Sequence, residues 1–335
     1  MGVDVTASPA PTFSDIEDAA GRLAGLGVKT PLVESPRLNE RLGGRVLIKA
    51  EMLQRTGSFK FRGAYNRLSR IEGRARRLGV VAYSSGNHAQ GVAAAAALLD
   101  IPALIVIPAD APHGKIAATR AYGAEVVLYD RLTGNREALG KDLAEERGAT
   151  LVSPYDDPFV VAGQGTVGME LAAQARRLDA HLDAVLVPCG GGGLIAGCAL
   201  ALAGESPGSG VYAVEPEGFD DTARSLEAGR RLANKENAGS FCDALLAPLP
   251  GEMTFAVNSR LLAGGLVVSD DAAAAAMVAA FAHFKLVAEP GGAVALAAVL
   301  SGAFDCRGKT VCVVCSGGNV DAEVFRKVLR GAGAD

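Results

Sequence analysis

The chain has 335 residues, of which 49% are hydrophobic and 21% are charged, and its formal net charge is −4. This length suits two domains, and the slightly acidic balance excludes the basic footprint typical of proteins that bind nucleic acid. The longest apolar runs, such as GVAAAAALL, are too short to span a bilayer, so we expect no membrane partner.

Short apolar segments alternate with helix-like segments along the chain. We expect strands at residues 45–53, 79–84, 102–108, 124–130, 149–154, 183–189, 210–217 and 308–316. We expect helices at residues 58–73, 88–100, 113–123, 135–148, 165–178, 194–204 and 322–330, and a strand leading into a helix across 266–284. Continuous apolar strands between helices are typical of parallel sheets covered on both faces. The predicted fold is therefore α/β, with two domains, each a mostly parallel twisted sheet flanked by helices.

The predicted strands fall into two groups, and the change comes near SPYDDPF. We expect a large domain of residues 1–78 and 158–335 and a small domain of residues 79–157. In such folds, ligands bind beyond the carboxyl ends of the strands. Three loops at those ends are rich in glycine or small polar residues: SSGNHAQG at 84–91, CGGGGLIAG at 189–197 and CSGGNVD at 315–321.

The second of these loops has four consecutive glycines, Gly190 to Gly193, between a predicted strand and a predicted helix. Such a loop lets backbone amides and a helix amino terminus approach a phosphate closely. The alternative is a flexible turn, but four ordered glycines cost much conformational entropy, which favours phosphate binding. The loop is not a Walker loop, because no Lys-Ser/Thr pair follows, and Ile195 breaks the dinucleotide pattern G-x-G-x-x-G.

The stretch GSFKFRG places Lys60 between two phenylalanines. Ser58 suits a helix N-cap, which would put Lys60 in the first helical turn, where the helix dipole and apolar neighbours disfavour the ammonium form. Schiff-base chemistry requires a lysine with a lowered pKa. The alternative is a surface lysine on a helix that also carries Arg62, Arg67 and Arg70. A reactive lysine together with a phosphate loop describes a pyridoxal phosphate site, which favours the first interpretation.

The six cysteines and four histidines show no zinc-binding spacing. Cys312 and Cys315 lie three residues apart on a predicted strand, so their side chains should point to opposite faces and share neither a metal nor a disulfide. The amino terminus has no secretory signal pattern. We therefore expect six reduced, mostly buried thiols in a cytoplasmic protein.

Five motifs, GSFKFRGA, SSGNHAQG, AGQGT, PCGGGGL and SGGNVD, occur in this order along the chain. On these motifs the chain resembles the serine/threonine dehydratase and serine racemase family of pyridoxal-phosphate enzymes, which have fold type II, that of tryptophan synthase β. The resemblance runs from about Phe13 to about Val328, and it is strongest to the racemase-like and hydroxyaspartate-dehydratase-like members.

The resemblance implies a site for pyridoxal 5′-phosphate. Lys60 would form the Schiff base and later move protons at the substrate Cα, and Phe59 would pack near the cofactor ring. Asn87 would hydrogen-bond the ring 3′-oxygen, and Ser316 would face the pyridine nitrogen. The phosphate would bind at Gly190, Gly191, Gly192 and Gly193. A neutral hydroxyl at the pyridine nitrogen makes the ring a weaker electron sink, which suits an elimination in which the leaving group removes the electrons at once.

The resemblance also implies where the substrate α-carboxylate binds. Ser84, Ser85 and Asn87 lie in the loop that would receive it. Ser85 matches the serine that acts as acid or base on the cofactor face opposite the lysine in racemase-like members, where many threonine dehydratases have alanine. The alternative role for Ser85 is a carboxylate-binding hydroxyl. His88, in the same loop, is interpreted as structural.

Two further positions bear on the substrate. Arg136 matches the racemase-like pattern and would pair with a second substrate carboxylate, although a helix-surface arginine is the alternative. Asp243 is expected on the substrate side. It lies in FCDAL, where the family often has Ala-Asp-Gly, so Ala244 departs from the family pattern.

The stretch VEPEGFDD matches the divalent-cation site of the racemase-like members. Glu215 and Asp221 would bind the cation, and the Phe219 carbonyl would contribute. Oxygen ligands of this kind suit Mg²⁺, Ca²⁺ or Mn²⁺. Without the resemblance, a solvated acidic loop would be the default interpretation. A homodimer is also expected by resemblance.

These observations predict a pyridoxal-phosphate lyase that dehydrates and deaminates a small β-hydroxy amino acid, releasing a keto acid and ammonia. Ser85 and Arg136 favour 3-hydroxyaspartate, with serine or threonine as further substrates. The alternative is a serine or aspartate racemase. An alternative of a different class is a non-catalytic protein that binds a phosphate-bearing ligand.

Overall fold

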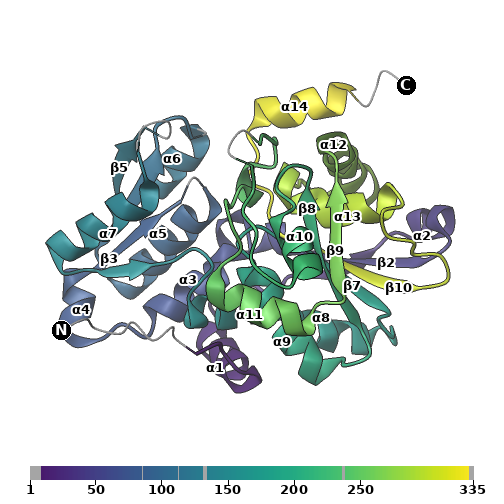
Figure 1. Cartoon of the computed structure of the whole chain (residues 1–335), viewed down its shortest axis with the longest axis horizontal. Coiled ribbons are helices and arrows are strands. Elements are labelled where there is room, and N and C mark those ends of the chain that lie inside the picture. The colour runs from purple at the N-terminus through teal and green to yellow at the C-terminus, as the bar shows by residue number, and fades with distance from the viewer. Residues whose placement is uncertain (1–8, 85, 112, 131–133, 236–237, 332–335) are drawn as a thin grey trace.

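The structure, a computed structural model, describes residues 9–84, 86–111, 113–130, 134–235 and 238–331. Its strands form two separate sheets (Figure 1). The larger sheet has the strand order β1-β2-β10-β7-β8-β9, with bounds β1 Leu32–Glu34, β2 Arg45–Ala50, β7 Ala184–Pro188, β8 Gly210–Pro216, β9 Gly264–Val268 and β10 Thr310–Cys315. The smaller sheet has the order β5-β4-β3-β6, with bounds β3 Val80–Tyr83, β4 Ala103–Pro108, β5 Glu125–Tyr129 and β6 Thr150–Val152.

Both sheets are mainly parallel, as the sequence predicted. All pairings in the smaller sheet are parallel. In the larger sheet only β1, an edge strand, pairs antiparallel with its neighbour β2. The predicted α/β class with two mostly parallel sheets is therefore confirmed.

Helices cover both sheets, as Figure 1 shows. Their bounds are α1 Phe13–Leu23, α2 Pro36–Leu42, α3 Lys60–Leu68, α4 Gly73–Leu78, α5 Asn87–Leu99, α6 His113–Ala121, α7 Arg136–Arg147, α8 Pro158–Arg177, α9 Gly193–Glu205, α10 Asp221–Ala228, α11 Glu252–Leu261, α12 Asp270–Ala279, α13 Pro290–Leu300 and α14 Ala322–Gly331. Short 3₁₀ turns lie at Glu51–Leu53, Arg55–Gly57 and Asp243–Leu245, and a π-helical turn lies at Ala280–Phe284. Within the described part of the chain, no helix is long and apolar enough to cross a membrane.

Successive residues of β2 and β10 face opposite cores. Val46 and Ile48 belong to the core that also holds Cys315, whereas Leu47 belongs to the core that holds Cys312. Cys312 and Cys315 therefore lie on opposite faces of the sheet, as expected. All six cysteines are buried and none forms a disulfide.

Helix α3 joins the two halves of the molecule. Its Phe61 and Ala64 share a core with β3 and α5 of the smaller-sheet side. On its other side Arg62, which is 1% exposed, pairs with Glu51 after β2 and with Glu170 on α8. The alternative of a basic surface helix is therefore wrong.

The start of α3 confirms one prediction and corrects another. The helix begins at Lys60, which lies in the first turn as expected. Ser58 is not its N-cap, because Phe59 occupies that position and no side chain caps the helix. Ser58 has extended backbone angles, but it lies one residue before the N-cap position. Its buried hydroxyl forms no hydrogen bond with any described residue.

Candidate active site

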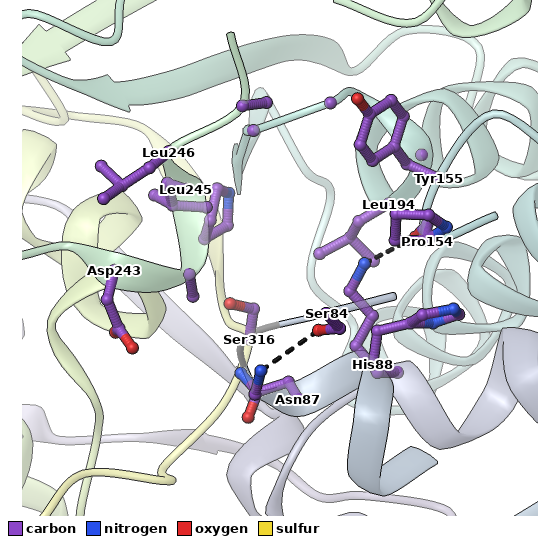
Figure 2. A pocket seen from close by; sticks show the side chains of 18 of the residues that line it. Ser84, Asn87, His88, Pro154, Tyr155, Leu194, Asp243, Leu245, Leu246 and Ser316 are labelled. Carbon is purple, nitrogen blue, oxygen red and sulfur yellow. Dashed lines mark hydrogen bonds between the residues drawn. The ribbon is translucent and has the colours of Figure 1, made fainter. Parts of the chain in front are cut away.

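A pocket lies where the loops that follow β3, β7 and β10 meet (Figure 2). The sequence motifs supply a large part of its lining, including Phe59, Lys60, Ser84, Asn87, His88, Gly190, Gly191, Gly192, Gly193 and Ser316. The loops after β7 and β10 lie together because these strands are parallel neighbours in the larger sheet, whereas the loop after β3 comes from the smaller sheet and meets them at the pocket.

Lys60 is held at the pocket wall by the first turn of α3. Its Nζ donates a hydrogen bond to the Pro154 carbonyl at 2.6 Å and lies 5.3 Å from the centre of the Phe59 ring. Burial lowers the pKa of Lys60 to about 8, and the positive charge of Arg136 acts in the same direction. The lowered pKa agrees with the prediction, and the structure adds Arg136 as a cause.

The four glycines connect β7 to α9 under tight packing. A Cβ atom on Gly191 would lie 2.3 Å from the Tyr155 ring, and one on Gly193 would lie 3.0 Å from the Tyr155 carbonyl oxygen. Gly192 has a φ of +90°, and a Cβ there would lie 2.8 Å from Asn258 Nδ2. Packing is therefore a second reason for glycine, beside phosphate binding.

The same loop offers unused donors. Within the described residues, no hydrogen bond uses the amide of Gly190, Gly191, Gly192 or Gly193 as its donor. These amides line the pocket at the amino terminus of α9, where the helix dipole favours an anion. The arrangement suits a phosphate group.

Asn87 is the first residue of α5, and both ends of its side chain are engaged. Its Nδ2 donates to Glu289 Oε1, and its Oδ1 accepts from Asn319 Nδ2 at 2.8 Å. The neighbouring His88 is buried, with Nε2 3.3 Å from the Val152 carbonyl oxygen. Burial, aided by the charge of Lys60, lowers the pKa of His88 to about 3, so its ring is neutral at pH 7, which agrees with a structural role.

The expected substrate residues lie around the same pocket. Ser84 Oγ accepts a hydrogen bond from the Gly86 amide at 3.1 Å (Figure 2). Arg136, at the start of α7, lines the pocket, as does Asp243. Ala244, where the chain departs from the family pattern, is also at the wall. Ser85 lies outside the described residues.

Several residues at or near the site were not singled out from the sequence, among them Lys115, Tyr155 and Glu289. Lys115 on α6 lines the pocket, and its Nζ lies 2.7 Å from Asp243 Oδ2 and 3.6 Å from Glu289 Oε2. Tyr155 packs on the glycine loop. Of these residues, only Tyr155 lies in a stretch that the sequence analysis noted, SPYDDPF, where the two groups of predicted strands meet. Lys115 falls in an ordinary helix pattern, and Glu289 precedes an alanine-rich one.

The expected cation ligands are buried away from this pocket. Glu215 accepts hydrogen bonds from the Thr222 and Ala223 amides at 3.0 and 2.8 Å. Asp221 accepts one from Asn234 Nδ2 at 2.6 Å, while its other oxygen has no hydrogen bond to any described residue. Burial raises the pKa of Glu215 to about 8 and that of Asp221 to about 6. No group of three histidine, cysteine or acidic side chains suited to a metal occurs within the described residues.

Comparison with known proteins identifies the class. The chain matches the family described as pyridoxal-phosphate dependent enzyme over residues 23–317. It is 44% identical to an L-threo-3-hydroxyaspartate ammonia-lyase of Pseudomonas sp, over 96% of this chain and 99% of that protein. It is similar to a crystal structure of threonine deaminase from T.th. (TM-score 0.87, 47% identity, 93% and 99% of the two chains). It is also similar to maize serine racemase (TM-score 0.89, 35% identity, 97% and 98% of the two chains).

The chain therefore belongs to the pyridoxal-phosphate dependent enzymes, as its motifs indicated. The residues at the pocket fit that cofactor. Lys60 supplies an amine with a lowered pKa, and the glycine loop supplies amides without partners among the described residues. Ser316 supplies a neutral hydroxyl at the end of β10.

Proposed function

We propose that the chain is a pyridoxal-phosphate lyase that removes water and then ammonia from a small β-hydroxy amino acid. The observation that carries this proposal is the presence, in one pocket, of the Lys60 amine and of glycine-loop amides that donate to no described residue. The bound cofactor supplies the electron sink that makes the substrate Cα proton acidic. A non-catalytic binding protein would have no need of a lysine with a lowered pKa.

Lys60 is the proposed base at the substrate Cα. With a pKa of about 8, roughly a tenth of free Lys60 would be the neutral amine at pH 7. The Pro154 carbonyl orients the amine through its hydrogen bond. Phe59 and Ser316 would contact the cofactor ring and its nitrogen, and Asn87 would donate to the ring oxygen.

The favoured substrate is 3-hydroxyaspartate, which carries a second carboxylate. Two cations besides Lys60 line the pocket. Lys115 is already paired with Asp243 and lies near Glu289, whereas Arg136 forms no ion pair with any described residue. Arg136 is therefore the proposed partner of the second carboxylate. The similarity to L-threo-3-hydroxyaspartate ammonia-lyase supports this choice.

The α-carboxylate is proposed to bind at Ser84, Ser85 and Asn87, at the amino terminus of α5. Ser85 is the proposed acid or base on the face opposite Lys60. A pair of proton-moving groups on two faces also permits racemisation, so racemase activity is the second candidate. The similarity to serine racemases supports keeping it in the test.

Further parts of the proposal concern the whole protein. We propose a divalent cation at Glu215, Asp221 and the Phe219 carbonyl, supported by the Asp221 oxygen that has no partner among the described residues. We also propose a cytoplasmic homodimer. We propose a small domain of residues 79–157 and a large domain of residues 1–78 and 158–335, supported by the four strands of the smaller sheet, which all lie in 79–157.

A parallel assay tests the proposed substrate. The protein, reconstituted with cofactor, is incubated with L-serine, L-threonine and the isomers of 3-hydroxyaspartate, and keto acid and D-amino acid are measured together. The proposal predicts the highest kcat/KM for keto acid release from a 3-hydroxyaspartate isomer. D-amino acid as the main product would favour the racemase, and no turnover of any substrate would favour the binding protein.

A further inference from the structure

Glu289 is a buried carboxylate that does not line the pocket, although it lies directly behind it. It precedes α13 and is 1% exposed. Glu289 occupies the N-cap position of α13, but its side chain makes no capping hydrogen bond. Helix capping therefore does not explain this residue, and a buried carboxylate costs free energy unless its partners compensate.

The carboxylate of Glu289 is directed at Asn87. Its Oε1 accepts a hydrogen bond from Asn87 Nδ2, and Oε2 lies 3.6 Å from Lys115 Nζ. Its backbone amide donates to the Gly317 carbonyl at 3.1 Å, next to Ser316. A Cβ atom on Gly317 would lie 2.2 Å from Oε1, so glycine is needed for this approach.

Asn87 can adopt only one amide orientation in this network. Asn319 Nδ2 donates to Asn87 Oδ1 at 2.8 Å and to the Thr56 carbonyl at 2.7 Å. A carboxylate only accepts and an amide NH₂ only donates, so exchanging the oxygen and nitrogen of Asn87 would break both contacts. The NH₂ of Asn87 has two protons, and the bond to Glu289 uses one of them.

We propose that Glu289 is a positioning residue that orients the Asn87 amide so that its second N–H donates to the ring oxygen of the cofactor. This inference rests on the cofactor-binding role of Asn87 in the proposed function. Lys115, on the smaller-sheet side, supplies the cation next to Glu289, and Asp243 shares that cation. Burial raises the pKa of Glu289 to about 7, whereas Lys115 opposes that rise and favours the charged form.

A double-mutant cycle tests this role. The dissociation constant of the cofactor is measured by absorbance titration of the apo protein for the wild type, Glu289→Ala, Asn87→Ala and the double variant. We expect each single variant to raise the dissociation constant about tenfold, as for a lost hydrogen bond to a charged group. Because Glu289 acts through Asn87, the double variant should be no more than about threefold worse than the weaker-binding single variant.

Three further measurements make the result decisive. Glu289→Gln keeps an acceptor for Asn87 at similar volume, so it should lose less affinity than Glu289→Ala. Glu323→Ala removes an exposed carboxylate on α14 and should leave affinity unchanged. Thermal midpoints of the apo forms show whether each variant folds.

Two results would overturn the role of Glu289. One is a double variant whose loss equals the product of the single losses, which means that Glu289 and Asn87 act independently. The other is Glu289→Ala with unchanged affinity. A wild-type protein that binds no cofactor would overturn the proposed function as well, so the two failures are distinguishable.

Discussion

Lys60 and Arg136 are both positively charged and line the same pocket. The charge of Arg136 helps burial to lower the pKa of Lys60 to about 8. A pocket with two neighbouring cations attracts an anionic substrate, and a second carboxylate at Arg136 would be held by charge-assisted hydrogen bonds. In the proposed function, Lys60 would move the proton and Arg136 would bind the second carboxylate.

Arg136→Gln should reduce turnover of 3-hydroxyaspartate selectively. Losing a charge-assisted pair costs about 1.5–3 kcal/mol, so kcat/KM for the dicarboxylate should fall by roughly one to two decades, while that for serine falls much less. Arg74→Gln, at an exposed position on α4, is the matched control and should change neither. Equal losses for serine and 3-hydroxyaspartate would show that Arg136 does not bind the second carboxylate.

The pKa of Lys60 predicts how cofactor uptake depends on pH. Only the neutral amine would react with the cofactor aldehyde, so the uptake rate of the apo protein should rise with pH through a midpoint near pH 8 and then level off. Arg136→Gln removes one cause of the lowered pKa and should move this midpoint to higher pH. Stopped-flow absorbance measures the rate. A wild-type midpoint near 10.5, the ordinary lysine value, would contradict the account.

Among the elements, α3 fixes the position of Lys60 through a buried network of charges. All five N–H groups of Arg62 are used, in bonds to both oxygens of Glu51 and of Glu170, to Thr166 and to the Val28 carbonyl. Lys49 adds a second cation, 2.7 Å from Glu170. The two cations balance the two carboxylates and tie α3 to α8, which follows the segment that carries Pro154.

Arg62→Met should destabilise the protein strongly. It would leave Glu51 and the largely buried Glu170 with one cation fewer, and breaking a buried pair in this way costs about 3–5 kcal/mol. Urea unfolding of the apo protein measures the loss. Arg74→Met, which removes an exposed arginine, should change the free energy of unfolding by no more than about 0.5 kcal/mol. A loss below about 1 kcal/mol for Arg62→Met would mean that the network does not hold α3.

The sequence predicted the parallel strands, and the helices that alternate with them, better than it predicted the remaining elements. The parallel strands are apolar and continuous, so all those that the structure describes were predicted, whereas β1, the antiparallel edge strand, has only three residues and shows no pattern. Helices α1, α2, α4, α10 and α11 were not predicted from the sequence. Helix α13 was missed because its apolar residues are buried on all sides and have no amphipathic period. The prediction that Ser58 is the N-cap of α3 was wrong, because Ser58 is extended and the N-cap position falls on the next residue, Phe59.

At the scale of the whole molecule, none of the proposed cation ligands lines the pocket. Removing the cation should therefore lower the thermal stability more than it changes the catalytic rate. EDTA should lower the thermal midpoint, and Mg²⁺, Ca²⁺ or Mn²⁺ should restore it, because bound metal stabilises only the folded state. Asp221→Ala should abolish this dependence. An unchanged midpoint and unchanged activity after EDTA, with the same result for Asp221→Ala, would show that no such cation is bound.

The family and fold could be predicted from the sequence because the motifs are local and specific, and the comparisons confirm both. The glycine loop and Ser316 line the pocket, as expected of residues that follow parallel strands, whereas Lys60, at the start of α3, was predicted from its own motif and from the family resemblance. Lys115 and Glu289 could not be found in this way. They reach the site through packing between segments far apart in the chain, and no local pattern marks that packing.

The central claim is that Lys60 binds pyridoxal phosphate and drives the elimination. The most direct test reconstitutes the wild type and Lys60→Ala with the cofactor and measures, for each, the visible absorbance of lysine-bound cofactor and keto acid release from 3-hydroxyaspartate. The account predicts a coloured, active wild type and a folded Lys60→Ala protein that has neither the absorbance band nor the activity. A wild type that stays colourless after reconstitution, or a Lys60→Ala protein that still releases keto acid, would contradict it.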